Sequence, residues 1–237
     1  MIVSINQPAY LPWLGYFERI AASDLHLVLD TVQFERNSFT NRNKVRTATG
    51  WAWLTVPVNL KGHLSGLAIA DVEIADDHWR RKHWSTIQQN YRRAPYFAEH
   101  SGFFEQLYAR PWHRLVDLLD AITRYLLRAF AITTEIRDAR SLGVEGRKSD
   151  LVLNLCRRAG ATRYLSGTLG RDYLDEASFR AAGIAVDYQD YAHPRYAQAY
   201  PGFEPYMSAI DLLFNAGPEA SRILLARREE PVARTSL

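Results

Sequence analysis

Short apolar runs alternate with segments of helical periodicity at both ends of the chain. Residues 2–5 (IVSI) and 25–30 (LHLVLD) are apolar runs of strand length, and residues 13–24 between them place apolar side chains at helical spacing. A strand, a helix and a second strand in direct succession predict a βαβ unit with parallel strands. Residues 163–191 repeat this order, with Gly183 as the helix stop. The sequence therefore predicts an α/β fold with a mainly parallel sheet flanked by helices.

The middle of the chain has a different pattern. Residues 31–47 are polar with little periodicity, which predicts a long loop. Residues 51–60 and 67–74 alternate between apolar and polar positions and predict a short β-rich insertion, with Pro57 at an edge or a strand end. From about residue 75 to residue 135 the spacing is helical, which predicts a helical subdomain.

Specific residues predict where the helices begin and end. Asp76 or Asp77 is expected to cap a helix, Pro111 to start a new one, and Ser149 to cap the helix that Gly160 ends. No repeat or low-complexity segment occurs. We therefore expect a single α/β domain over residues 1–230 and a flexible tail over residues 231–237.

The composition is that of a globular protein with enough length for a core: 237 residues, 47% hydrophobic and 23% charged. The formal net charge is +3 and the pI is about 9.0. The basic residues form short scattered clusters rather than a long run, so RNA binding stays open as an alternative on the pI alone.

The single cysteine, Cys156, excludes an internal disulfide and a cysteine-based metal site. It lies in an apolar helical pattern, which predicts a small core residue rather than a nucleophile. Residues 2–6 are too short for the core of a signal peptide, and no apolar run approaches the length of a membrane span. The sequence therefore predicts a cytoplasmic protein.

The loop after the first strand, NQPAYLPWLGYF, carries more polar and aromatic groups than a turn requires. Gln7 offers an amide, while Tyr10, Trp13 and Tyr16 offer flat faces with polar tips. The carboxyl edge of a parallel sheet is where such folds bind ligands, so these residues are candidate substrate contacts. A packed aromatic turn is the alternative. The glycine patterns of dinucleotide and P-loop sites are absent from the sequence.

The end of the second strand supplies a further set of candidates. Asp30 at the strand tip is expected to face the same edge as Gln7. Arg42 and Lys44 in the segment NRNK are suited to a phosphate or a carboxylate. A solvated loop is the alternative. The remaining candidate contacts in this stretch are Gln33, Asn41 and Asn43.

The helical middle offers a titratable pair. His83 and Tyr91 are a candidate acid–base pair, since a histidine titrates near neutral pH. The alternative is a half-buried helix residue. His78 and His83 do not have the HExxH spacing, so we expect no metal site.

Two late segments complete the candidate contacts. Both contain polar groups in otherwise apolar surroundings, and a polar group there is exposed, hydrogen-bonded or part of a site. We expect the first loop, the NRNK segment and the late helix to converge at one rim of the sheet and to enclose a polar pocket. The candidates in these two segments are Ser166, Gly167 and Tyr173, and then Ser208, Asp211 and Asn215.

The sequence resembles the WbqC-like protein family over nearly its whole length. The blocks that carry the resemblance are QPAYLPWLGYF, SDLHLVLDTVQFERNSFTNRN, WLTVP, HWSTIQQNY, YLSG with RDYLD, FRAAGIAVDY and SAIDLLFNAG. The resemblance implies a role in bacterial surface-polysaccharide synthesis, notably of O-antigen. For one branch it implies a glycine transferase that acylates an amino sugar.

From the residues and the resemblance together we expect an amide-forming aminoacyl transferase acting on a nucleotide-linked amino sugar. Arg42 and Lys44 would hold phosphate or carboxylate charge, and Asp30 or His83 would deprotonate the attacking amine. No cofactor is evident. The acyl donor stays open between a carrier thioester, an aminoacyl-tRNA and an amino acid activated with ATP. The alternative is a non-catalytic protein of the same pathway that binds a nucleotide-sugar or a partner enzyme. The oligomeric state is open.

Overall fold

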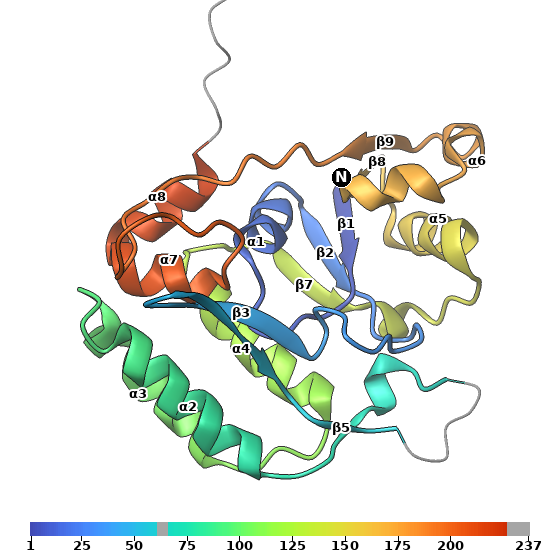
Figure 1. Ribbon diagram of the computed structural model, residues 1–237. Helices are drawn as coiled ribbons and strands as arrows, with labels where there is room; N and C mark the ends of the chain where they lie inside the picture. The colour runs from blue at the N-terminus through green and yellow to red at the C-terminus, as the bar shows by residue number, and fades with distance from the viewer. Residues whose placement is uncertain (61–65, 227–237) are drawn as a thin grey trace, which may run out of the picture.

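Five parallel strands form the central sheet of the computed structural model, which describes residues 1–60 and 66–226 (Figure 1). The strand order is β7-β2-β1-β8-β9, and every neighbouring pair is parallel. The predicted α/β class with a parallel sheet is confirmed. The strands are β1 (Ile2–Asn6), β2 (Leu25–Val28), β7 (Glu135–Asp138), β8 (Arg163–Ser166) and β9 (Ala185–Tyr188).

The two faces of the sheet are covered by different helices. Val3 and Ile5 of β1 pack with α5 (Lys148–Ala159) in one apolar cluster. Alternate residues of a strand point to opposite sides of the sheet, so the other face needs its own cover. It is covered by α1 (Leu14–Ala21) and α4 (Leu115–Ala129). Figure 1 shows α5 on the side of β8 and β9 opposite to α1.

A two-stranded antiparallel hairpin lies outside the central sheet. It pairs β3 (Arg42–Thr47) with β4 (Gly50–Thr55) and is the predicted β-rich insertion. The prediction of a loop over residues 31–47 is wrong in its second half. The strand pattern there is concealed because Asn43, a polar residue, points inward and is fully buried, while cations point outward.

The rest of the insertion is shorter than its alternation predicts. Pro57 interrupts the predicted strand 51–60, since proline cannot donate to a ladder, and only β5 (Val58–Asn59) continues beyond it. The segment 67–74 folds as a 3₁₀ turn, η1 (Ile69–Asp71), and the two-residue strand β6 (Glu73–Ile74).

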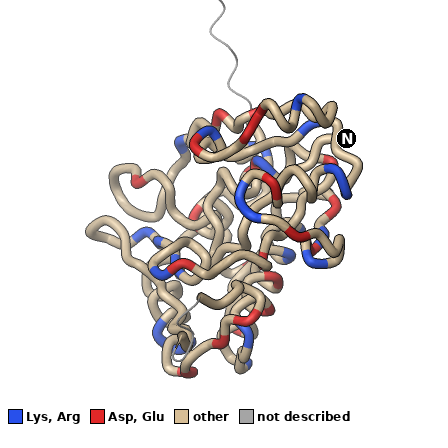
Figure 2. The backbone as a smooth tube through the Cα atoms, turned by 90° about the vertical axis from the view of Figure 1, so that its right-hand side faces the viewer, with Lys and Arg blue, Asp and Glu red and all other residues tan. Residues whose placement is uncertain are grey.

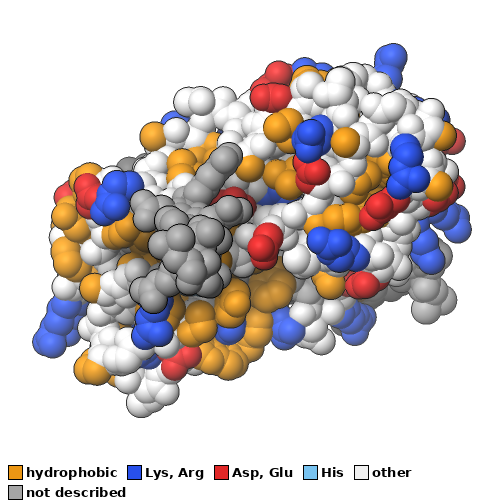
Figure 3. Space-filling model, turned by 90° about the horizontal axis from the view of Figure 1, so that it is seen from above, with side chains coloured by type: hydrophobic (Ala, Val, Ile, Leu, Met, Phe, Trp, Pro, Cys, Tyr) orange, Lys and Arg blue, Asp and Glu red, His pale blue; other side chains and the backbone are white. Residues whose placement is uncertain are grey.

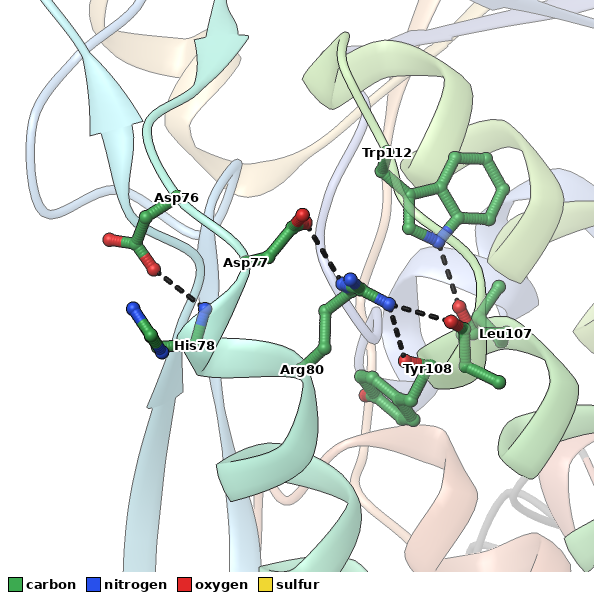
Figure 4. Close-up of polar contacts among 8 residues, drawn as sticks. Asp76, Asp77, His78, Arg80, Leu107, Tyr108 and Trp112 are labelled. Carbon is green, nitrogen blue, oxygen red and sulfur yellow. Dashed lines mark hydrogen bonds and ion pairs between the residues drawn. The ribbon is translucent and has the colours of Figure 1, made fainter.

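Helices α2 (His78–Tyr91) and α3 (Phe97–Ala109) lie side by side and, with α4, form the predicted helical region. Figure 4 shows how Arg80 joins the start of α2 to the end of α3. Arg80 donates to the Tyr108 carbonyl at 3.1 Å and pairs with Asp77 at 3.0 Å. Of the two predicted caps, the Asp76 carboxylate is the one that accepts from the His78 amide, at 2.9 Å.

Two predicted helix starts are wrong. The fourth helix starts at Leu115 rather than Pro111, because the residues before it are extended and the Ile74 amide donates to the His113 carbonyl. Ser149 does not cap α5, since its hydroxyl accepts from the Asp175 amide instead.

The helices in the second half of the chain end where the sequence predicts. The predicted stops at Gly160 and Gly183 are confirmed, with φ of 75° and 73°, and α6 (Glu176–Ala181) precedes the latter. The predicted tail over residues 231–237 lies outside the described residues. The last helices are α7 (Ala209–Ala216) and α8 (Ala220–Leu225), with the 3₁₀ turn η4 (Gly217–Glu219) between them.

Charges of both signs are scattered over the molecule. Figure 2 shows basic and acidic residues interspersed along the chain, and Figure 3 shows both among apolar side chains on one face. Among residues 1–60 and 66–226, no helix combines the length and apolarity needed to cross a bilayer.

Candidate functional site

A cavity of about 180 Å³ lies at the carboxyl edge of the sheet. The ends of β1, β2 and β7 form one side of it, and a face of α4 forms the other. We call it the edge cavity. Ligands of parallel α/β folds bind at this edge, because the strand ends and the loops that follow them converge there.

Four carboxylates lie among the apolar residues that line the edge cavity. Asp30, Asp117, Asp120 and Asp138 contribute to it, together with two arginines. Arg124 donates to both oxygens of Asp120 at 2.8 Å, and Arg140 pairs with Asp30. Four carboxylates against two guanidiniums leave an excess of negative charge, which attracts a cationic group such as a protonated amine.

Asp30 is the most enclosed of these carboxylates, with 2% of its surface exposed. One oxygen accepts from Arg140, while Oδ1 is buried and has no hydrogen-bond partner among the described residues. Burial raises the pKa of Asp30, and the Arg140 guanidinium opposes that rise. A carboxyl with a raised pKa and an unengaged oxygen beside a cavity is suited to accept a proton.

The edge cavity includes residues that the sequence analysis missed. Asp138 ends β7 much as Asp30 follows β2, so the rule of parallel-strand ends that led to Asp30 applies to it as well. Arg140 follows closely after it. Nothing in the sequence pairs Arg140 with Asp30, 110 positions earlier in the chain.

A second cluster of polar side chains lies between the ends of β1 and β8. These two neighbouring strands flank the point where the strand order reverses. Arg19 donates to the Asn6 side chain, and its Nε is buried without a partner among the described residues. Burial lowers the pKa of Arg19. A Cβ at position 167 would displace this guanidinium, so Gly167 leaves room for it in its present position. The structure thus places Gly167 beside a cation, with Ser166 and Tyr173 nearby.

The first loop divides between this edge and the interior. Gln7 is exposed, and Tyr16 lines the edge cavity. Trp13 is half-buried against Tyr191 and lies on Gly15, where a Cβ would collide with the indole. Tyr10 was predicted to contact substrate, but its side chain is fully buried and packs in the core.

His83 and Tyr91 do not form the expected pair. The His83 ring bonds to the Tyr10 hydroxyl at 2.8 Å, while Tyr91 donates to Asp211 at 2.9 Å. His83 is 4% exposed, and burial lowers its pKa to about 3. It therefore stays a neutral core residue at physiological pH, and its surroundings do not favour the predicted role as a base.

Two buried histidines make the stability of the fold depend on pH. Burial lowers the pKa of both His26 and His83 to about 3, below their unfolded value of about 6.5. Their contribution is complete above pH 6.5 and is lost as the pH falls toward 3. Lowering the pH from 7.5 to 5.0 should cost about 2 kcal/mol of unfolding free energy for each. Urea unfolding at the two pH values measures this.

The variant His83→Gln should weaken this pH dependence, because it removes one of the histidines whose pKa burial lowers most. His78→Gln, at an exposed position of the same helix, is the matched control and should leave it unchanged. Equal pH dependence of the parent and His83→Gln would contradict the assignment.

The three segments expected to converge do meet, through hydrogen bonds in the interior. The Ser208 amide donates to the Lys44 carbonyl at 2.9 Å, and the Ala209 amide to the Pro12 carbonyl at 2.8 Å. Asn43 donates to the Leu11 carbonyl at 2.7 Å. Buried main-chain carbonyls need such donors. Of the three segments only the first loop lines the edge cavity, so packed interior contacts stand where a shared polar pocket was expected.

Asp211 is the centre of this interior network. It is fully buried and accepts from Tyr91 and Tyr196 at 2.9 Å and from Gln198 at 2.8 Å. Asn215 donates to the Asp211 carbonyl at 2.7 Å. These bonds account for the polar side chains of the late helix as structural groups.

The remaining candidates lie on the insertion. Asn41 lines a separate cavity of about 670 Å³ beside Arg36 and Asn37. Arg42 and Lys44 lie on the outer face of the hairpin, and Gln33 is exposed. The structure therefore distributes the predicted contacts over several places rather than one pocket.

The family assignment rests on nearly the whole chain. The model of the WbqC-like protein family matches residues 7–223. The chain belongs to the WbqC-like protein family. The uncharacterized protein Rv1507c of Mycobacterium tuberculosis is 37% identical to this WbqC-like protein over 223 residues, which is 92% of this chain and 95% of the relative. No solved structure matches it.

The match includes the residues that line the edge cavity, from Pro8 to Arg140. Within residues 1–60 and 66–226, no group of three or more His, Cys, Asp or Glu side chains is arranged to hold a metal ion.

Proposed function

We propose that this WbqC-like protein forms an amide by transferring an aminoacyl group, glycine, onto the amine of a nucleotide-linked amino sugar. The observation that carries the proposal is Asp30, a buried carboxyl with a raised pKa and an unengaged oxygen beside an acidic cavity. The family resemblance supports a place in surface-polysaccharide synthesis. The excess carboxylates would draw in the ammonium form of the acceptor.

Asp30 then has a defined task. The bound ammonium carries no lone pair, so it must lose a proton before it attacks. Asp30 would take that proton, and the amine nitrogen would bond to the activated carbonyl carbon. The bond from that carbon to the donor's leaving group then breaks. Arg140 would position the Asp30 carboxyl and keep its basicity from rising further.

The size of the edge cavity limits what it holds. At about 180 Å³ it is smaller than the pockets that enclose whole drug-sized ligands. It suits the amine-bearing part of the acceptor, with the nucleotide outside. A carrier thioester, an aminoacyl-tRNA and an ATP-activated amino acid are the three candidate donors.

The test is incubation with a panel of amino-sugar nucleotides and glycine in each of the three activated forms. Mass spectrometry should show the acceptor gaining one glycyl residue. Acceptors whose amine is already acetylated are the matched control and should show no gain. If no acceptor gains mass with any donor, while a known transferase is active in the same assay, the proposal fails. Binding of the nucleotide-sugar without transfer would favour the alternative of a non-catalytic binding protein.

A further inference from the structure

The outer face of the β3–β4 hairpin exposes aromatic side chains. Trp51 is 46% exposed, Trp53 is 38% exposed, and Phe39 just before the hairpin is 50% exposed. Large apolar side chains gathered on one surface are typical of an interaction site. We call Phe39, Trp51 and Trp53, together with Arg42 and Lys44, the aromatic platform.

The register of the hairpin explains why these residues share a face. Lys44 lies opposite Trp53, and Arg46 lies opposite Trp51. Residues of the other face, such as Val45 and Leu54, are buried in the core. The alternation therefore presents one apolar face inward and an aromatic, cationic face outward.

The three rings form a row. The ring centroids of Trp51 and Trp53 are 5.8 Å apart, and those of Trp53 and Phe39 are 6.0 Å apart. The hairpin that carries Trp51 and Trp53 is anchored by Arg46. Its guanidinium donates to the Gly50 carbonyl at 2.7 Å and to the Pro201 carbonyl at 2.8 Å. Arg46 thus fastens the hairpin turn to the loop beside it.

Two cations lie directly on this row. The Arg42 guanidinium is 4.4 Å from the centroid of Trp53, and the Lys44 ammonium is 5.0 Å from that of Trp51. Neither cation forms an ion pair with an acidic side chain in the described part of the chain. The platform therefore combines stacking surfaces with positive charge that no internal acid neutralises.

We propose that the aromatic platform binds an unpaired stretch of nucleic acid. Single strands are bound by aromatic side chains on which bases stack, next to cations that contact the phosphates, and the platform has both. A duplex hides the faces of its bases and would not use the rings. A neutral sugar chain would stack on indoles but would not require Arg42 and Lys44. The net charge of +3 is compatible with an anionic partner.

Fluorescence anisotropy with short labelled oligo(U) and oligo(dT) tests this inference. Both should bind, with quenching of tryptophan fluorescence and weaker binding at higher salt. A preference between them identifies RNA or DNA as the source of the strand. Heparin, an anionic chain without bases, serves as the comparison and should cause no comparable quenching.

Variants separate stacking from charge. Trp53→Ala should weaken binding about tenfold, and Lys44→Gln should reduce the slope of affinity against salt. Leu169→Ala, at a position that is 76% exposed and away from the hairpin, should bind as the parent does. Circular dichroism and urea unfolding check that each variant is folded.

Absence of oligonucleotide binding, or full affinity in both Trp51→Ala and Trp53→Ala, would overturn the inference. So would equal binding of heparin with no effect of the tryptophan variants, which would indicate charge alone. Because the readout is binding, the result does not depend on whether glycyl transfer is observed.

Discussion

Replacement of Asp30 by asparagine is expected to lower glycyl transfer by about 10²- to 10⁴-fold, the range of a lost general base. Asparagine has the size of aspartate but cannot accept the proton of the incoming amine. Because three other carboxylates remain in the edge cavity, binding of the acceptor should weaken far less than turnover falls. Steady-state kinetics give the loss of turnover, and calorimetric titration with the nucleotide-sugar gives the affinity.

The matched control is Asp187→Asn, which also removes a carboxylate paired with an arginine, Arg163, but at an exposed site on the sheet. It should transfer glycine as the parent does. Full turnover in Asp30→Asn would show that this carboxyl is not the base. Loss of affinity with no catalytic effect would favour the binding-protein alternative.

The variant Arg140→Gln tests how the guanidinium of Arg140 affects the pKa of the Asp30 carboxyl. The guanidinium opposes the rise in the pKa of Asp30, so removing it should raise that pKa further. At a given pH more of the base is then protonated, and the acidic limb of the pH–rate profile should move to higher pH. An unchanged profile would show that Arg140 does not position or tune the base.

Replacement of Asp211 by alanine is expected to lower the free energy of unfolding by about 4 kcal/mol. The substitution leaves the hydroxyls of Tyr91 and Tyr196 and the amide of Gln198 without their buried acceptor. Urea unfolding at neutral pH measures the loss. Asp211→Asn should lower the free energy of unfolding by less, because its amide oxygen still accepts a hydrogen bond. It should still cost some stability, because its NH₂ group faces other donors.

Asp190→Ala, at an exposed position, is the control and should change stability by less than about 0.5 kcal/mol. If Asp211→Ala unfolds like the parent but loses activity, then Asp211 contacts substrate and the structural assignment is wrong.

Much of the fold could be predicted because it depends on local patterns. The β1–α1–β2 unit follows from two apolar runs and a helical spacing between them, and the parallel pairing follows from the crossover. The hairpin strand β3 escaped prediction because its inward positions include Asn43, whose partner is the Leu11 carbonyl far away in the chain. A polar residue that satisfies a distant carbonyl cannot be distinguished from a solvated one in the sequence.

Asp30 and Asp211 show where local pattern stops being informative. Asp30 was predicted as a site residue from its place at a strand end, and Asp211 from its apolar helical surroundings. The order of residues was sufficient for the β1–α1–β2 unit, the parallel sheet and the position of Asp30 after a strand. It did not reveal that Asp30 meets Arg140 beside a cavity while Asp211 is enclosed by two tyrosines and a glutamine. Those neighbours come from distant segments, and the packing of such segments determines whether a carboxylate faces a ligand or the core.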